Sequence, residues 1–360
     1  MYLIDAHQDL AWNMLTFGRD YTRSVHETRQ REQDEIAPQV NGDTLLGWQE
    51  YQHGRVAVIF ATLFASPARA RLGEWDTLCY RDTEEAHALY TRQLDAYHRL
   101  TDEHPEKFRL LQNRRDLQAV LSLWAAQTER EPPVGLVILM ENAEGVRAPA
   151  ELEMWQARGV RIIGPAWAGT RFCGGTREPG ALTREGFALL ERMAELGLAL
   201  DLSHMDEAAA LQALDVYPAT LLASHANLMR LLPGYTGNRH LSDRVARGII
   251  ARDGVIGVVP ANYFLRPDWK RGDPRANVPL EYLAAQIDGI CQLAGDSLHA
   301  GIGSDFDGGF GLQSVPDGID TIADLHALTP LLQQKGYTDT DIAQIFGINW
   351  QRILTQILPA

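Results

Sequence analysis

The sequence is poor in cysteine, in clustered basic residues and in long apolar runs, and each scarcity excludes a class of protein. Its 360 residues include three cysteines, Cys79, Cys173 and Cys291, which lie far apart and form no C-x-x-C pair. An odd number of scattered cysteines argues against a disulfide framework and favours reduced thiols. We therefore expect a protein of the reducing cytoplasm.

The charge balance and the hydropathy pattern exclude further classes. There are 33 Lys and Arg against 47 Asp and Glu, a net charge of −14, and no basic run. This balance disfavours nucleic acid and anionic membranes as partners. No apolar stretch is long enough to span a bilayer, and the N-terminus lacks the pattern of a secretory signal. We expect a soluble protein that acts on a small molecule; a homodimer is compatible with these features.

What the sequence does contain is a regular alternation of short apolar runs and amphipathic stretches. We count about eight runs rich in Val, Ile and Leu, which are typical of strands in a parallel sheet. The expected strands cover residues 2–5, 56–64, 134–141, 160–167, 198–204, 219–225, 254–262 and 299–306, with a short extra strand at 108–111. The expected helices cover roughly 80–104, 114–127, 149–157, 183–195, 206–214, 242–252, 278–294, 322–335 and 349–357.

This alternation predicts a (β/α)8 barrel, or TIM barrel, that spans residues 1–360 as a single domain with loop insertions. The segment 19–44 is polar and aperiodic, and the segment 263–279 is irregular and contains three prolines. We interpret both as loop insertions over the active site.

Chemistry in such barrels lies at the C-terminal ends of the strands. The polar side chains that close the apolar runs are His7, Asp9, Glu141, His204, His225 and Asp305. A single histidine at a strand end is more often structural than a ligand, but six such residues at predicted strand ends favour a common site. Residues i and i+2 of a strand project to the same face, so His7 and Asp9 can bind one ion side by side.

Imidazoles and carboxylates in this combination suit a pair of zinc-like ions that share a bridging carboxylate and keep positions open for water. Glu141 is the expected bridge, with Glu144 as its alternative in "ENAEG". His204 and His225 are assigned to the second ion. Asp305 then remains to accept and deliver a proton.

Six motifs in this order resemble the membrane (renal-type) dipeptidases, peptidase family M19 of the amidohydrolase superfamily. They are "DAHQDL", "LME", "DLSH", "SHAN", "NRHLSD" and "GIGSDFDG". The resemblance implies a (β/α)8 barrel with two zinc ions that hydrolyses dipeptides, including some with a D-residue at the C-terminal position. It assigns His7, Asp9, Glu141, His204 and His225 to the metals and Asp305 to proton transfer. It also assigns Arg239 to the terminal carboxylate of the substrate, a role suited to a planar guanidinium.

The sequence departs from the family in two places. Trp167 stands where the family carries a histidine that helps to polarise the scissile carbonyl, so we expect Trp167 to contact substrate and ordinary dipeptidase activity to be altered. Animal members carry a secretory signal and a lipid anchor, whereas this sequence shows neither a signal nor a hydrophobic tail, so a free cytoplasmic enzyme is expected.

The leading interpretation is a zinc-dependent dipeptidase that acts on dipeptides or related small amides with a free carboxylate. One alternative is a metal-dependent barrel that acts on a non-peptide such as an N-acyl amino acid, a lactone or a biosynthetic intermediate. Another is a non-catalytic binding barrel, which the complete set of candidate ligands disfavours.

Overall fold

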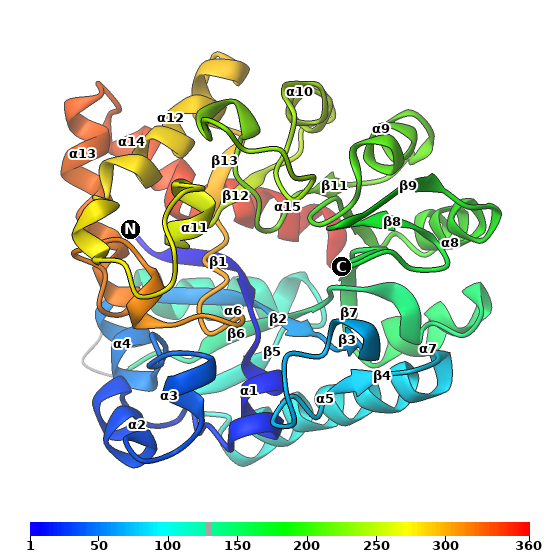
Figure 1. Cartoon of the computed structure of the whole chain (residues 1–360), viewed down its shortest axis with the longest axis horizontal. Helices are drawn as coiled ribbons and strands as arrows, with labels where there is room; N and C mark the ends of the chain where they lie inside the picture. Colours follow the sequence, from blue (N-terminus) through cyan, green and yellow to red (C-terminus); the bar gives the residue numbers. More distant parts are fainter. Residues whose placement is uncertain (127–130) are drawn as a thin grey trace.

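The computed structural model describes residues 1–126 and 131–360, and its centre is a parallel sheet that curls into a nearly closed barrel (Figure 1). Eight strands follow one another in the order β11-β10-β7-β6-β2-β1-β13-β12. A parallel bridge between Ala223, just after β11, and Ile256 in β12 joins the two ends. The (β/α)8 barrel expected from the sequence is therefore confirmed.

The strands of the barrel lie close to the predicted runs. They are β1 (Leu3–Gln8), β2 (Val56–Leu63), β6 (Val134–Met140), β7 (Val160–Ile163), β10 (Ala199–Asp201), β11 (Leu221–Leu222), β12 (Ile256–Val258) and β13 (Ala300–Ile302). The extra strand expected at 108–111 is β5 (Phe108–Leu110), which pairs with β6. Every residue of β1, β2 and β6 is buried, as expected for strands covered on both faces.

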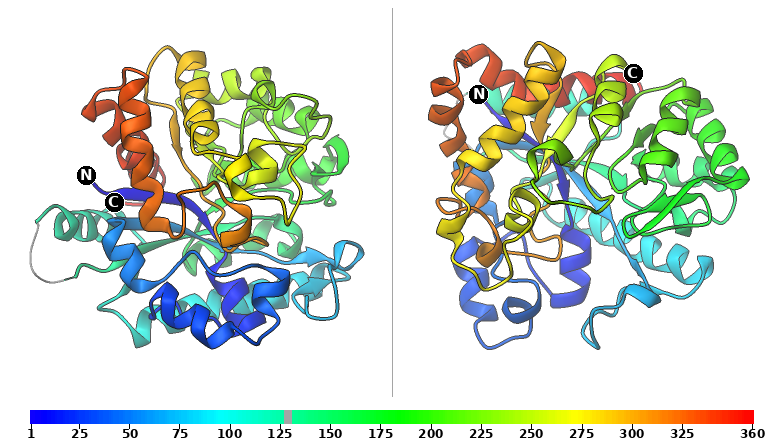
Figure 2. Two further views of the ribbon diagram at one scale, coloured as in Figure 1. Left: turned by 60° about the vertical axis from the view of Figure 1, so that its left-hand side comes forward. Right: turned by 45° about the horizontal axis from the view of Figure 1, so that its top comes forward.

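Helices surround the barrel on its outer side (Figures 1 and 2). Those that match expected helices are α5 (Thr83–Glu103), α6 (Arg114–Ala125), α7 (Leu152–Ala157), α8 (Arg184–Glu195), α9 (Glu207–Val216), α10 (Asp243–Ala251), α12 (Glu281–Ala294), α13 (Leu328–Gln334) and α15 (Asn349–Ile357). The last residue of the helix expected at 114–127 lies outside the described residues. Helix α8 begins directly after Thr183, whose side chain caps it by accepting a hydrogen bond from the Gly186 amide.

Several strands are shorter than predicted, and the candidate site residues lie on the turns that follow them. Strand β7 ends at Ile163, before Trp167, because Gly164 and Pro165 follow and proline has no amide hydrogen for the ladder. Strand β10 ends at Asp201 and β13 at Ile302. His204 and Asp305 have backbone φ angles of 66° and 55°, a left-handed conformation that no strand contains.

The segment 19–44 was expected to be a loop insertion, and the structure shows that part of it is helical. It contains α2 (Val25–Glu32) and α3 (Ala37–Val40). The Ser24 side chain and the Glu27 side chain form a reciprocal capping box at the start of α2. Arg19 holds the segment from within, because its buried guanidinium contacts the carboxylates of Glu32 and Asp307 at 2.9 and 3.0 Å. Asp307, in the sequence "DFDG", thus anchors this insertion.

Other elements were not expected from the sequence. They are α1 (Leu10–Phe17), α4 (Trp48–His53), α14 (Asp339–Ala343), the pair β3 (Ser66–Pro67) and β4 (Cys79–Tyr80), and the antiparallel hairpin β8 (Cys173–Gly175) and β9 (Glu178–Leu182). Helix α11 (Asn262–Leu265) overlaps the start of the segment 263–279. The segment also contains one short 3-10 turn, Arg275–Asn277, and is otherwise irregular. Across residues 1–126 and 131–360, each helix is too short or too polar to cross a bilayer. The three cysteines are free.

Candidate active site

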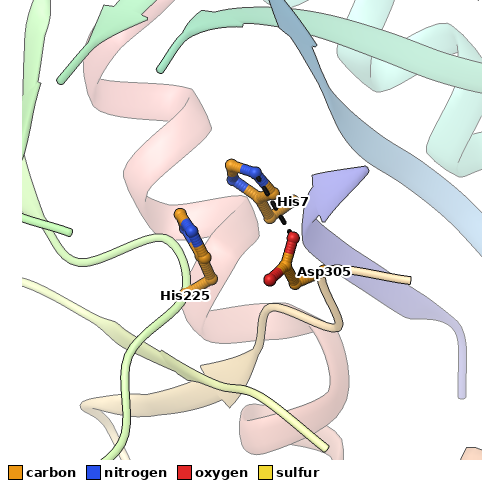
Figure 3. A group of neighbouring side chains, drawn as sticks. All are labelled: His7, His225 and Asp305. Carbon is orange, nitrogen blue, oxygen red and sulfur yellow. Dashed lines mark ion pairs between the residues drawn. The ribbon is translucent and has the colours of Figure 1, made fainter. Parts of the chain in front are cut away.

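The six candidate residues converge at the C-terminal end of the barrel. His7 lies in β1 and Asp9 directly after it, Glu141 follows β6, His204 follows β10, His225 follows β11 and Asp305 follows β13. None of the six is more than 8 % exposed. Figure 3 shows the side chains of His7, His225 and Asp305 pointing toward one another from three separate segments. Residues about 300 positions apart thus share one site because parallel strands end at one edge.

Glu141 lies at the centre of this group. Its Oε1 atom is 3.6 Å from Nε2 of His7, 3.2 Å from Nε2 of His204 and 3.3 Å from Nε2 of His225. Glu144, the alternative bridge, instead pairs with Arg171, whose Nη1 is 2.9 Å from Glu144 Oε1. The geometry therefore gives Glu141, and not Glu144, a position between the candidate ligands.

Three overlapping groups of side chains could each hold a metal ion, with one ligand atom per residue and all atoms of a group within 4.8 Å of one another. These groups are His7, Asp9 and Glu141; Glu141, His204 and His225; and His7, His225 and Asp305. The first two share Glu141 and match the division inferred from the sequence. The third places Asp305 closer to the ligands than the sequence indicated, with Oδ1 3.8 Å from His7 Nε2.

The electrostatics of the cluster fit a bound cation. Burial, with the positive charge of Arg239 as a further cause, holds the pKa of His7 and His204 well below the usual value, so both imidazoles are neutral, as metal ligation requires. Burial and then the charge of Asp9 raise the pKa of Glu141 and Asp305, because clustered carboxylates repel. His7 Nε2 is buried without a hydrogen-bond partner among the described residues. A divalent cation would satisfy this atom and offset the repulsion.

Behind the ligands, Asp201 and Ser224 orient two imidazoles. The Ser224 hydroxyl donates to Asp201 Oδ2 and lies 2.8 Å from Nδ1 of His225 and 3.4 Å from Nδ1 of His7. Asp201 Oδ1 also accepts the backbone amides of Ser203 and Ser224, both at 2.9 Å. If each Nδ1 carries the proton, both Nε2 atoms are free to bind metal, which is the usual arrangement behind ligating histidines.

The third imidazole is oriented from a different element. Thr176, in the turn between β8 and β9, places its hydroxyl 2.9 Å from Nδ1 of His204. The sequence alone did not identify Ser224 or Thr176 as residues that orient the imidazoles. Ser224 directly precedes His225 in "SHAN", and this adjacency was an available signal. Thr176 lies 28 residues before His204, and only the folded hairpin brings the two together.

Arg239 lies on the loop after His225 and is 5 % exposed. Its Nη2 donates to the His225 carbonyl at 2.9 Å, and its Cζ lies 5.1 Å from the centre of the Phe264 ring. The Nε and Nη1 atoms are buried and have no acceptor among the described residues. His240, which the sequence analysis did not single out, packs against Phe264 with ring centres 4.8 Å apart and supports this wall.

A cavity of about 650 Å³ opens over the cluster and is lined in part by Asp9, Glu141, His204, Arg239 and Asp305. Trp167 also lines it, with its ring centre 6.0 Å from that of His204 and 5.2 Å from that of Phe64. The volume suits a small organic ligand.

A family model for the membrane dipeptidases, peptidase family M19, matches residues 1–359. The chain belongs to this family. It is thus a metallopeptidase of the dipeptidase type. Membership implies a metal ion, for which the cluster of histidines and carboxylates described above offers candidate ligands.

Individual relatives agree with this membership. The chain is 32 % identical over 250 residues to an uncharacterised protein from the pqqA 5′ region of Klebsiella pneumoniae, covering 66 % of this chain and 88 % of that protein. It is 27 % identical over 306 residues to the dipeptidase ataJ of Aspergillus terreus, covering 77 % and 70 %.

Solved structures support the fold. A metallopeptidase from Rhodobacter sphaeroides, liganded with a phosphinate mimic of the dipeptide L-Ala-D-Ala, superimposes with a TM-score of 0.79 at 22 % identity over 99 % of both chains. The probable dipeptidase PvdM from Pseudomonas aeruginosa gives a TM-score of 0.80 at 20 % identity, covering 99 % of this chain and 96 % of that one.

Proposed function

We propose that this member of the family is a zinc dipeptidase with two ions per chain. The observation that carries the proposal is the position of Glu141, whose Oε1 lies within 3.6 Å of three imidazole Nε2 atoms. His7 and Asp9 would hold one zinc ion, His204 and His225 the other, and Glu141 would bridge them. Bound zinc would polarise the scissile carbonyl and lower the pKa of a water molecule.

Asp305 would act as the proton carrier. Its carboxyl group borders the cavity beside the candidate ligands, and burial followed by the charge of Asp9 raises its pKa. A carboxylate in this position can take a proton from water and deliver it to the leaving amine.

Arg239 would bind the terminal carboxylate of the dipeptide. Its Nε and Nη1 atoms are without acceptors among the described residues, and the contact with His225 holds the guanidinium beside the cluster. A carboxylate that accepts from such a fork gains charge-assisted hydrogen bonds in a site where water is largely excluded. The proposal requires a small substrate as its only partner and is compatible with a homodimer. The free cysteines agree with a cytoplasmic enzyme.

Trp167 favours a second candidate, hydrolysis of a related amide such as an N-acyl amino acid. The indole lines the cavity beside His204, and the resemblance to the family puts it where other members carry a histidine. An indole has one donor and does not exchange protons, so polarisation of the carbonyl would depend more on metal.

The experiment is a comparison of matched substrates on protein loaded with zinc and analysed for metal content. L-Ala-L-Ala and L-Ala-D-Ala test dipeptide hydrolysis, N-propanoyl-alanine removes only the α-amine, and alanyl-alaninamide removes only the terminal carboxylate. Turnover of a dipeptide with roughly two zinc ions per chain supports the proposal. Turnover of the N-acyl compound alone supports the second candidate. Lack of turnover of the whole set by metal-loaded protein would contradict both.

A further inference from the structure

One wall of the cavity is a continuous row of aromatic rings that none of the metal or carboxylate contacts uses. The Trp167 ring lies 5.2 Å from that of Phe64, and the Phe64 ring 6.4 Å from that of Trp12, measured between ring centres. All three residues line the cavity, as does Leu72, whose side chain is 71 % exposed. An apolar side chain this exposed at the edge of an aromatic wall enlarges the apolar surface open to a ligand.

Hydrogen bonds hold the backbone segments that carry two of these rings. The Gln93 side chain of α5 accepts from the Phe64 amide at 3.0 Å and donates to the Phe64 carbonyl. The Trp167 carbonyl accepts from the Thr176 amide at 2.9 Å. Trp12 stands on α1, one turn after Asp9, and is 5 % exposed. Segments held in this way lose little further backbone freedom when a ligand binds.

The barrel order places this wall opposite Arg239. Trp12, Phe64 and Trp167 follow β1, β2 and β7, which lie in one half of the barrel. Arg239 lies between β11 and β12, which are across the barrel from β2 and β6. Figure 1 agrees, since α11, which carries Phe264 beside Arg239, and the β3–β4 segment lie on opposite sides of the barrel centre.

We propose that the wall formed by Trp12, Phe64, Trp167 and Leu72 is a subsite for a bulky apolar group on the acyl side of the scissile amide. This inference rests on the proposed function, because a substrate whose carboxylate binds Arg239 and whose amide lies over the cluster must extend its acyl side toward the opposite wall.

One of the charged residues near the wall is already paired with a residue outside the cavity lining. Glu178, which lines the same cavity, forms an ion pair with Arg69, with 2.6 Å between Glu178 Oε2 and Arg69 Nη2. The rings that line the cavity offer apolar area and favourable ring stacking. Burying a phenylalanine or leucine side chain in place of hydrogen changes an association constant by about ten- to a hundredfold.

The test uses a dipeptide series with one C-terminal residue, Gly-Ala, Leu-Ala and Phe-Ala, and compares kcat/KM across it. The parent should prefer Phe-Ala to Gly-Ala by about ten- to a hundredfold. Phe64→Ala should lower kcat/KM for Phe-Ala at least tenfold more than for Gly-Ala, and Phe64→Leu should retain most of the preference. The matched control is Phe187→Ala on α8, which removes a ring that is 40 % exposed and does not line the cavity.

A binding measurement separates this inference from the proposed function. Non-cleavable analogues of Phe-Ala and Gly-Ala, in which a methyleneamine replaces the amide, are titrated calorimetrically into parent and variants. A tenfold or greater affinity ratio that disappears in Phe64→Ala supports the subsite, even if dipeptides are not hydrolysed. Equal affinity of the parent for both analogues, or equal losses for both in Phe64→Ala, would overturn the subsite while leaving dipeptide hydrolysis intact.

Discussion

Glu141 is buried among three imidazoles and two further carboxylates, in a position where a single oxygen faces three Nε2 atoms. The negative charges of Asp9 and Asp305 act on it, and burial is the largest cause of its raised pKa. A cation bound between these groups would offset the repulsion among the carboxylates. The role of each residue can therefore be tested through the metal content of a variant as well as through its catalytic rate.

Replacing Glu141 with Gln removes the shared negative charge, and zinc content should fall from roughly two equivalents to below one. His204→Ala should lose mainly one equivalent, because its imidazole belongs to only one group of candidate ligands. The measurement is elemental analysis after dialysis against a fixed free zinc concentration. Glu144→Gln is the matched control, since Glu144 pairs with Arg171 outside the cluster. Full zinc content in Glu141→Gln would contradict the bridging role.

Asp305→Asn should lower kcat by roughly two to four powers of ten, the usual contribution of an acid or base, with zinc content nearly unchanged. The structure makes this test informative because Asp305 Oδ1 lies only 3.8 Å from His7 Nε2. Steady-state kinetics and metal analysis on the same preparation distinguish the two roles. Loss of zinc together with activity would make Asp305 a ligand, and retained turnover would remove it from the mechanism.

At the scale of elements, the insertion of residues 19–44 is fastened to the barrel by buried charge. Asp307, directly after the β13 turn, accepts from the Leu45 amide, the Thr44 hydroxyl and the Tyr21 hydroxyl as well as pairing with Arg19. Because Asp307 stands two residues after Asp305, this network links the position of the insertion to the position of the proposed proton carrier.

Arg19→Met should lower the free energy of unfolding by about 3–5 kcal/mol, because it leaves the buried carboxylates of Asp307 and Glu32 without their partner. Urea titration followed by circular dichroism measures the change. Arg23→Met is the matched control: Arg23 pairs with Asp20 at 3.0 Å, but the two side chains are 37 % and 43 % exposed. Arg23→Met should lower the free energy of unfolding by less than about 1 kcal/mol. Similar losses for both variants would show that Arg19 does not anchor the insertion.

At the scale of the whole molecule, the metal site joins strands from all parts of the barrel. Its proposed ligands come from β1, β6, β10 and β11 or from the turns after them, and Asp305 follows β13. Bound ions would therefore crosslink segments that the chain itself connects only through long βα units, and metal binding should stabilise the folded state as a whole.

Removing zinc with a chelator should lower Tm. When the free zinc concentration is a hundred times the Kd of a site, binding at that site adds about 2.7 kcal/mol to the free energy of unfolding, and the chelator removes this contribution. Scanning calorimetry over a series of buffered free zinc concentrations measures the dependence. Glu141→Gln should show a smaller shift than the parent at every zinc concentration. A Tm that does not respond to zinc in the parent would be incompatible with a metal site formed by these strands.

The sequence by itself was enough to predict the barrel and the list of candidate site residues. Both depend on local patterns, namely the spacing of apolar residues within each strand and the polar residues that follow each strand. It placed His7, Asp9, Glu141, His204, His225 and Asp305 at strand ends, and the structure brings all six together. Whether each has its proposed role stays a prediction.

Only the tertiary structure decided how the rest of the site is assembled, because those contacts join residues distant in the chain. The hydrogen bond of Thr176 to His204 and the row of rings from Trp167 to Trp12 depend on the packing of separate βα loops. The helices of the 19–44 segment escaped prediction for a related reason: α2 is polar on most of its surface, and its order comes from the capping box and from Arg19, whose partner Asp307 is 288 positions away in sequence. Hydrophobic periodicity records burial against a core, and it carries no signal for an element that is held by buried charge.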